Sequence, residues 1–101
     1  MHYFGEYFWY LENDEGSITI GITDEGLEET GDVRQIVLAE AEEELNADEG
    51  CGTIRGRDAY MEIPAPMDLR ILERNEFLLE NAELVHEDPT GESWLLKVEE
   101  I

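Results

Sequence analysis

Turn-forming residues interrupt this chain so often that each apolar run between them has room only for a short strand or a short helix. The segments 13–16, 64–66 and 88–91 read Asn-Asp-Glu-Gly, Pro-Ala-Pro and Asp-Pro-Thr-Gly. Residues 17–22 alternate large apolar side chains with small ones, which is typical of a strand with one buried face. About seven or eight short strands, with turns about every 8 to 12 residues, predict a mainly β barrel or sandwich.

We expect one or two short helices among these strands. Thr23 or Asp24 can cap the first helix, because their side-chain oxygens can accept hydrogen bonds from free amides of the first turn. Gly31 is expected to end that helix, at a position that commonly takes a left-handed backbone. One further helical turn is expected at 77–81. The expected strands cover residues 7–12, 17–22, 33–39, 50–57, 59–63, 69–73 and 94–98.

The remaining segments are expected to be loops or a loose end. Residues 40–49 carry six acids and no base, so we interpret them as a solvated loop with Leu45 turned inward. Residues 1–6 are expected to be frayed. The length fits a single domain over residues 1–101, because one hydrophobic core suits a chain of this size.

The charge balance limits the possible partners. The chain has 27 acidic and 6 basic side chains, a formal charge of −21. Such a body repels nucleic acid and anionic membranes, which bind proteins mainly through Lys and Arg. We therefore expect protein partners, with no nucleic acid and no membrane among them.

The single cysteine, Cys51, rules out an internal disulfide and a multi-cysteine zinc site. A lone cysteine in a strand is more often a small buried hydrophobe than a reactive thiol, which would need a positioned base. The first residues lack the basic start and long apolar stretch of a secretion signal, so we expect a cytoplasmic location.

Several short motifs resemble those of one carrier family, and Trp9 falls where that family has a tryptophan in its first strand. The motifs read Ile-Gly-Ile-Thr-Asp at 20–24, Gly-Asp-Val at 31–33, Asn-Glu at 75–76, Glu-Leu-Val at 83–85, Asp-Pro at 88–89 and Trp-Leu-Leu-Lys at 94–97. They are similar in residue type and spacing to those of the glycine cleavage system H protein, a lipoyl-carrier domain, over about residues 7–99.

This resemblance implies both a fold and a way of working. The fold would be a flattened β-barrel, or barrel-sandwich hybrid of lipoyl-domain type, built from two short sheets. In that family a lysine at the tip of a β-hairpin carries a lipoyl group. The lipoyl arm shuttles an aminomethyl fragment between a pyridoxal-phosphate decarboxylase, a folate-dependent transferase and a flavin dehydrogenase.

The chain departs from the family at the hairpin tip. The family motif E-S-V-K-A corresponds to Arg-Gly-Arg-Asp-Ala at 55–59, which puts Asp58 at the carrier position. A carboxylate has no nucleophilic amine and cannot form the lipoyl amide, and Arg55 reverses the charge of the family's glutamate. The only lysine, Lys97, is expected in the middle of the last strand. We therefore expect no lipoyl group and no other cofactor.

Three functions stay open on this basis. The first is a non-enzymatic, protein-binding or regulatory module for glycine-cleavage or other lipoate-dependent enzymes. The second is a genuine aminomethyl and lipoyl carrier. The third is a small metal-binding or hydrolytic protein that uses the acidic loop and His86. A metal needs converging ligands, and a single histidine in an acidic turn does not supply them. No catalytic residue and no set of metal ligands stands out.

The tip residues Arg55, Gly56, Arg57 and Asp58 are the candidate site for docking a protein partner. They place two of the six cations at one turn of an acidic chain. The alternative is a solvated Arg-Asp turn with no binding role, because aspartate suits turn geometry.

Overall fold

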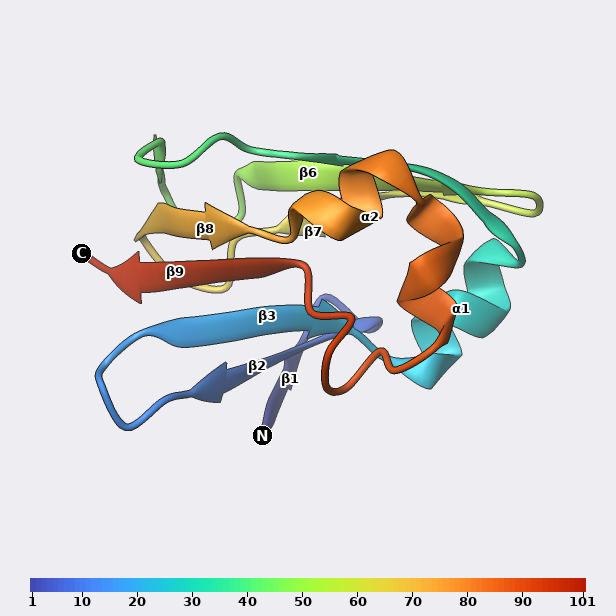
Figure 1. Cartoon of the computed structure of the whole chain (residues 1–101). Coiled ribbons are helices and arrows are strands. Elements are labelled where there is room, and N and C mark those ends of the chain that lie inside the picture. The colour runs from blue at the N-terminus through green and yellow to red at the C-terminus, as the bar shows by residue number, and fades with distance from the viewer.

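The computed structural model describes residues 1–101 as a mainly β molecule with three short helical segments (Figure 1). The helical segments are α1 (Asp24–Thr30), α2 (Glu76–Glu80) and the 3-10 helix η1 (Ala82–His86). The strands are β1 (His2–Phe4), β2 (Phe8–Glu12), β3 (Ile18–Ile22), β4 (Val33–Leu38), β5 (Glu44–Leu45), β6 (Gly50–Gly56), β7 (Tyr60–Pro64), β8 (Leu69–Arg74) and β9 (Leu96–Glu100).

The strands form two antiparallel sheets. One sheet has the order β1-β2-β3-β9-β8-β5 and the other has the order β4-β6-β7. A single cluster of 21 buried side chains draws on both sheets, so one core holds them together. The sheets do not close into a barrel, and the expected mainly β barrel-sandwich with short helices is confirmed.

The β2–β3 hairpin is packed on both of its faces. Ile18, Ile20 and Ile22 all point into the core, as their alternation predicts. On the other face the ring of Trp9 lies directly over Gly21, where any side chain would overlap the indole. Both residues of that contact are therefore restricted by close packing.

Helix α1 begins and ends where the sequence predicts. The Thr23 hydroxyl accepts a hydrogen bond from the Gly26 amide at 3.1 Å, which caps the first turn. Gly31 follows the helix with φ of +69°, and its amide donates to the Leu27 carbonyl.

Three local predictions need correction. Residues His2–Phe4 are not frayed but form β1, which pairs with β2, because the Phe4 ring packs 5.7 Å from the ring of Phe8. Within the acidic loop, Glu44–Leu45 pairs with β8, and Leu45 is buried as expected. The last strand begins at Leu96 rather than at residue 94. None of the helices is long and apolar enough to cross a membrane.

Candidate functional site

The hairpin of β6 and β7 reaches to the end of the molecule beside α1 (Figure 1). Its turn is closed by the Gly56 amide, which donates to the Ala59 carbonyl at 2.9 Å. Arg57 and Asp58 form the tip, as predicted, and their side chains are 57% and 53% exposed. The tip therefore presents a guanidinium and a carboxylate to solvent, and no amine.

The backbone of this tip is tied to the end of α1. The Asp58 amide donates to the Thr30 carbonyl and the Arg57 amide donates to the Asp32 carbonyl, both at 2.9 Å. The Asp58 carboxylate lies against Gly31, where a side chain would overlap it. The turn is thus held in one position although its side chains are exposed.

The charge of Arg57 is balanced within the chain. Its guanidinium lies 3.3 Å from the Asp58 carboxylate and 3.5 Å from the Asp32 carboxylate. The hydrogen bond to Asp58 and the charges of both acids raise the pKa of Arg57. Arg57 therefore stays cationic and is partly neutralised by its neighbours.

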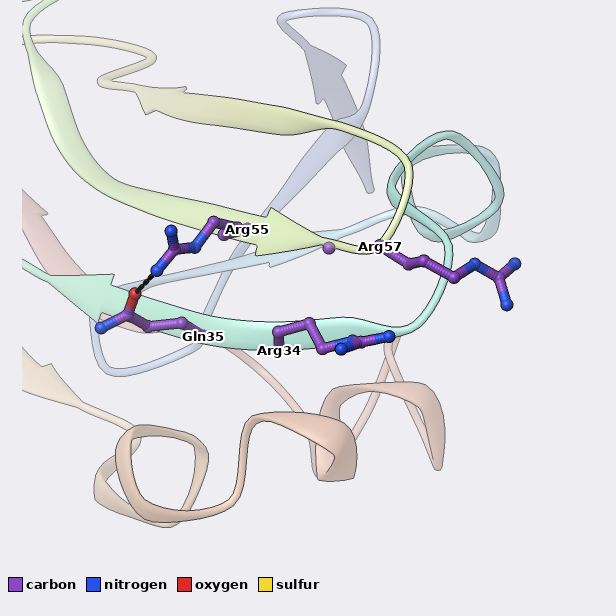
Figure 2. A pocket seen from close by; sticks show the side chains of 5 residues that line it. Arg34, Gln35, Arg55 and Arg57 are labelled. Carbon is purple, nitrogen blue, oxygen red and sulfur yellow. Dashed lines mark hydrogen bonds between the residues drawn. The ribbon is translucent and has the colours of Figure 1, made fainter.

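A shallow hollow of about 560 Å³ lies beside the tip, on the face formed by β4 and β6. Arg55 donates a hydrogen bond of 2.9 Å to the Gln35 side-chain oxygen across it, and the Arg57 side chain points away, beyond the tip (Figure 2). The hollow takes in three of the predicted docking residues but not Asp58, which faces α1 instead. Its lining residues are Arg34, Gln35, Arg55, Gly56 and Arg57.

The only lysine lies far from the tip turn in the fold. Lys97 is in β9, inside the six-stranded sheet, between partners Thr19 on β3 and Glu73 on β8. Its ammonium group is 4.8 Å from the centre of the Trp94 ring, a cation–π contact. Lys97 is thus in the last strand, as expected, although it is the second residue of that strand rather than a middle one.

The cysteine and the histidine both have packing roles. Cys51 is fully buried, and burial together with the charge of Glu43 raises the pKa of its thiol to about 12. The His86 Nε2 atom accepts a hydrogen bond of 3.1 Å from the Val33 amide. His86 thus satisfies the first amide of β4.

The acidic loop and His86, which a metal-binding or hydrolytic protein would use, do not come together in the structure. His86 is in η1, which packs on β4 near the α1 end, whereas the loop 40–49 lies at the opposite end of the sandwich (Figure 1). Nowhere do three His, Cys, Asp or Glu side chains come together as metal ligands.

The two-layer β fold with one long hairpin is that of a lipoyl-type barrel-sandwich domain. A structural match supports this class: the glycine cleavage system H protein from Mycobacterium marinum superposes with a TM-score of 0.88 and 27% identity, covering 97% of this chain and 81% of that one.

The chain belongs to the glycine cleavage H-protein family, whose model matches residues 1–100. It is 41% identical to the glycine cleavage system H protein of Treponema denticola over 100 residues, covering 98% of this chain and 80% of that protein. It is 35% identical to the protein of the same name from Chromohalobacter salexigens, covering 97% of this chain and 75% of that protein. The predicted family resemblance is confirmed.

Two residues of the hollow, Arg34 and Gln35, were not among the predicted docking residues. Strand alternation would put these neighbours on opposite faces. A bulge in the pairing of β4 with β6, between Val33 and Gln35, leaves both of them exposed. The available signal was weak: Arg34 is one of only six cations in the chain.

Proposed function

We propose that this chain is a non-lipoylated member of the H-protein family that acts as a protein-binding or regulatory module for glycine-cleavage or other lipoate-dependent enzymes. The observation that carries the proposal is the residue in the hairpin turn: Asp58 is there, and the nearest candidate amine is in another sheet. The proposal gives the chain no catalytic step of its own, and it places the module in the cytoplasm.

The chemistry of lipoyl attachment supports the proposal that this chain carries no lipoyl group. A lipoyl amide forms when an amine attacks an activated carboxyl group, and Asp58 offers only a second carboxylate. Lys97 has an amine, but its side chain rests on the Trp94 ring within a six-stranded sheet. An attaching enzyme reads a protruding turn, and the β9 position does not offer one.

The retained scaffold supports a docking role. The tip turn is held to α1 by two backbone hydrogen bonds, so the surface around it keeps one shape without a lipoyl arm. A preformed surface binds a partner without the entropy loss of ordering a loop. The tip residues Arg55, Gly56, Arg57 and Asp58 are therefore proposed as part of that docking surface.

A genuine carrier is the second candidate, and the names of the relatives favour it. The similar proteins from Treponema denticola and Chromohalobacter salexigens are each called a glycine cleavage system H protein. In this chain such a carrier would need its acyl group on Lys97, the single lysine.

Intact-mass measurement separates these two candidates. The purified chain is incubated with a lipoate ligase, lipoate and ATP, next to the variants D58K/R55E and K97R. We expect no mass gain for the wild-type chain and one lipoyl group on D58K/R55E, because that variant presents the amine and the glutamate at the tip. A lipoyl mass on the wild-type chain that K97R abolishes would make this protein a carrier.

Docking is tested by competition. We expect the unmodified chain to slow a glycine-cleavage reaction that depends on a lipoylated H protein, because both scaffolds would occupy the same enzyme surface. The slowing should weaken as the lipoylated H protein is raised. Serum albumin at equal concentration is the control for nonspecific effects. No change in rate and no complex by light scattering would refute the docking role.

A further inference from the structure

The cations of this acidic chain are concentrated around the hollow beside the tip. Three of the 6 basic side chains line it, and all three are arginines. Arg34 and Arg55 make no ion pair, although the chain has 27 acids and each of Arg57, Arg70 and Arg74 pairs with at least one. Two unpaired guanidinium groups at one place are therefore a distinctive feature of this surface.

The register of the three-stranded sheet extends this surface across all its strands. Gln35 of β4 lies opposite Arg55 of β6, and Arg55 lies opposite Tyr60 of β7. Residues directly opposite one another share a face of the sheet. Tyr60 is 63% exposed, and Arg34 lies on the same side beside the β4 bulge, because it lines the same hollow as Gln35 and Arg55. We call Arg34, Gln35, Arg55 and Tyr60 the arginine face.

The acids closest to the arginine face in the chain form no ion pair with Arg34 or Arg55. Asp32 and Asp58 both pair with Arg57. Glu62, two residues along from Tyr60, extends toward Gly50 at the far end of β6. Arg55 uses a single hydrogen bond, to a neutral amide, and Arg34 uses none. A guanidinium has five N–H donors, so this face keeps most of its capacity to bind an anion.

We propose that the arginine face docks a carboxylate-rich segment of a partner protein. Arginine matches a carboxylate with two parallel hydrogen bonds, and arginine and tyrosine are the side chains that most often anchor protein interfaces. The net charge of −21 repels long polyanions, so the partner presents a few carboxylates at one place rather than a continuous charged backbone.

This inference rests on the proposed function only in taking the partner to be a protein. It goes beyond that proposal by naming the partner's chemistry and by assigning the anchoring charge to Arg34 and Arg55 rather than to Arg57. Arg57 at the tip is already paired, whereas Arg34 and Arg55 are free to bind.

The test is a titration of the full chain, labelled with nitrogen-15, with a synthetic eight-residue peptide of alternating glutamate and glycine at low salt. We expect amide and guanidinium shifts confined to β4, β6 and β7 around the arginine face. R34Q/R55Q should weaken binding by about tenfold, because it removes two exposed charge pairs. R70Q/R74Q removes the same charge elsewhere and should bind as the wild type does.

Other outcomes overturn the proposal. These are no shifts at millimolar peptide, shifts spread equally over Arg70 and Arg74, or equal weakening by both double variants. Inorganic phosphate that binds as tightly as the peptide would make this a small-anion site. If no lipoate-dependent enzyme binds the chain but the peptide shifts map to the arginine face, the proposed function fails and this inference stands. If the enzymes bind R34Q/R55Q as they bind the wild type, this inference fails alone.

Discussion

At the residue scale, Cys51 acts as a core side chain whose ionisation the fold suppresses. Its pKa is raised to about 12, first by burial and second by the charge of Glu43. An unfolded thiol ionises from about pH 8.5 to 9 upward, whereas the buried thiol stays neutral. The unfolded state is therefore favoured increasingly as the pH rises from about 9 toward 12.

The corresponding prediction compares the wild-type chain with C51A across alkaline pH. Below pH 8 the Cys51 contribution to the free energy of unfolding is fully present. By pH 10 the wild-type chain should lose about 1.4 to 2 kcal/mol relative to C51A, which has no thiol to ionise. Urea unfolding at a series of pH values measures the difference. A constant difference from pH 7 to pH 10.5 would show that the thiol titrates in the folded state as it does in the unfolded one.

Trp9 joins parts of the chain that are far apart in sequence. Its indole N–H lies 3.1 Å from both the Ile22 and the Pro89 carbonyl oxygens, and the residue is buried. We expect W9F to lower the free energy of unfolding by about 1 to 3 kcal/mol, because it leaves the buried Ile22 carbonyl and the partly buried Pro89 carbonyl without this donor. W94F is the matched control: Trp94 is only half-buried and its indole donates no hydrogen bond to the chain, so its loss should be smaller. Chemical unfolding of both variants decides the point, and equal losses would contradict it.

At the element scale, the contact between the end of α1 and the β6–β7 hairpin determines where the tip lies. Gly31 contributes to that contact in two ways. Its φ is positive, which favours glycine, and its lack of a side chain leaves room for the Asp58 carboxylate. The hairpin tip is therefore held by a helix that belongs to neither sheet. A substitution of Gly31 should therefore disturb the packing of the hairpin tip as well as the end of the helix.

The variant G31A tests this coupling, and G16A is its control. Gly16 has φ of +98°, but nothing lies within 4 Å of where a side chain would go. Both glycines have a positive φ, so alanine at either position costs about 1 to 3 kcal/mol in backbone strain. G31A should cost more than G16A, because Gly31 has a backbone conformation (φ 69°, ψ −155°) that is almost confined to glycine and because the new methyl group displaces the Asp58 carboxylate. Adding D58A should restore part of that excess in G31A and none in G16A, as measured by a double-mutant cycle. Additive effects would show that the contact is unimportant.

At the scale of the whole molecule, charge repulsion opposes folding. The formal charge is −21, and the structure records only four ion-pair contacts to offset it. We expect the free energy of unfolding to rise by about 1 kcal/mol or more between 10 mM and 0.5 M NaCl, because salt screens the repulsion of the compact state. KCl should act equally if screening is the cause. A stability that falls with added salt would contradict this prediction.

The same charge pattern links the two proposals. A body that repels anions at long range but exposes two unpaired arginines on one sheet can select a partner by where its carboxylates lie. The hairpin tip and the arginine face are adjacent, since Arg55 and Arg57 line the same hollow. A partner that contacts the tip would also reach the arginine face.

Most strands, the α1 cap and the β6–β7 hairpin could be predicted from the sequence. Turn residues and side-chain alternation act over a few neighbouring positions, so short-range patterns carry that information. The pairing of His2–Phe4 and of Glu44–Leu45 could not be predicted, because each forms only when a partner strand is already in place.

The sequence by itself determined the fold family and the chemistry at the tip turn, which has an aspartate and no lysine, because both are matters of residue identity and spacing. Only the tertiary structure decided which arginines are free. The end of α1 brings Asp32 to Arg57, and a bulge in β4 turns Arg34 outward beside Arg55. Ion pairing and side-chain direction depend on neighbours distant in sequence, and those neighbours come together only in the folded molecule.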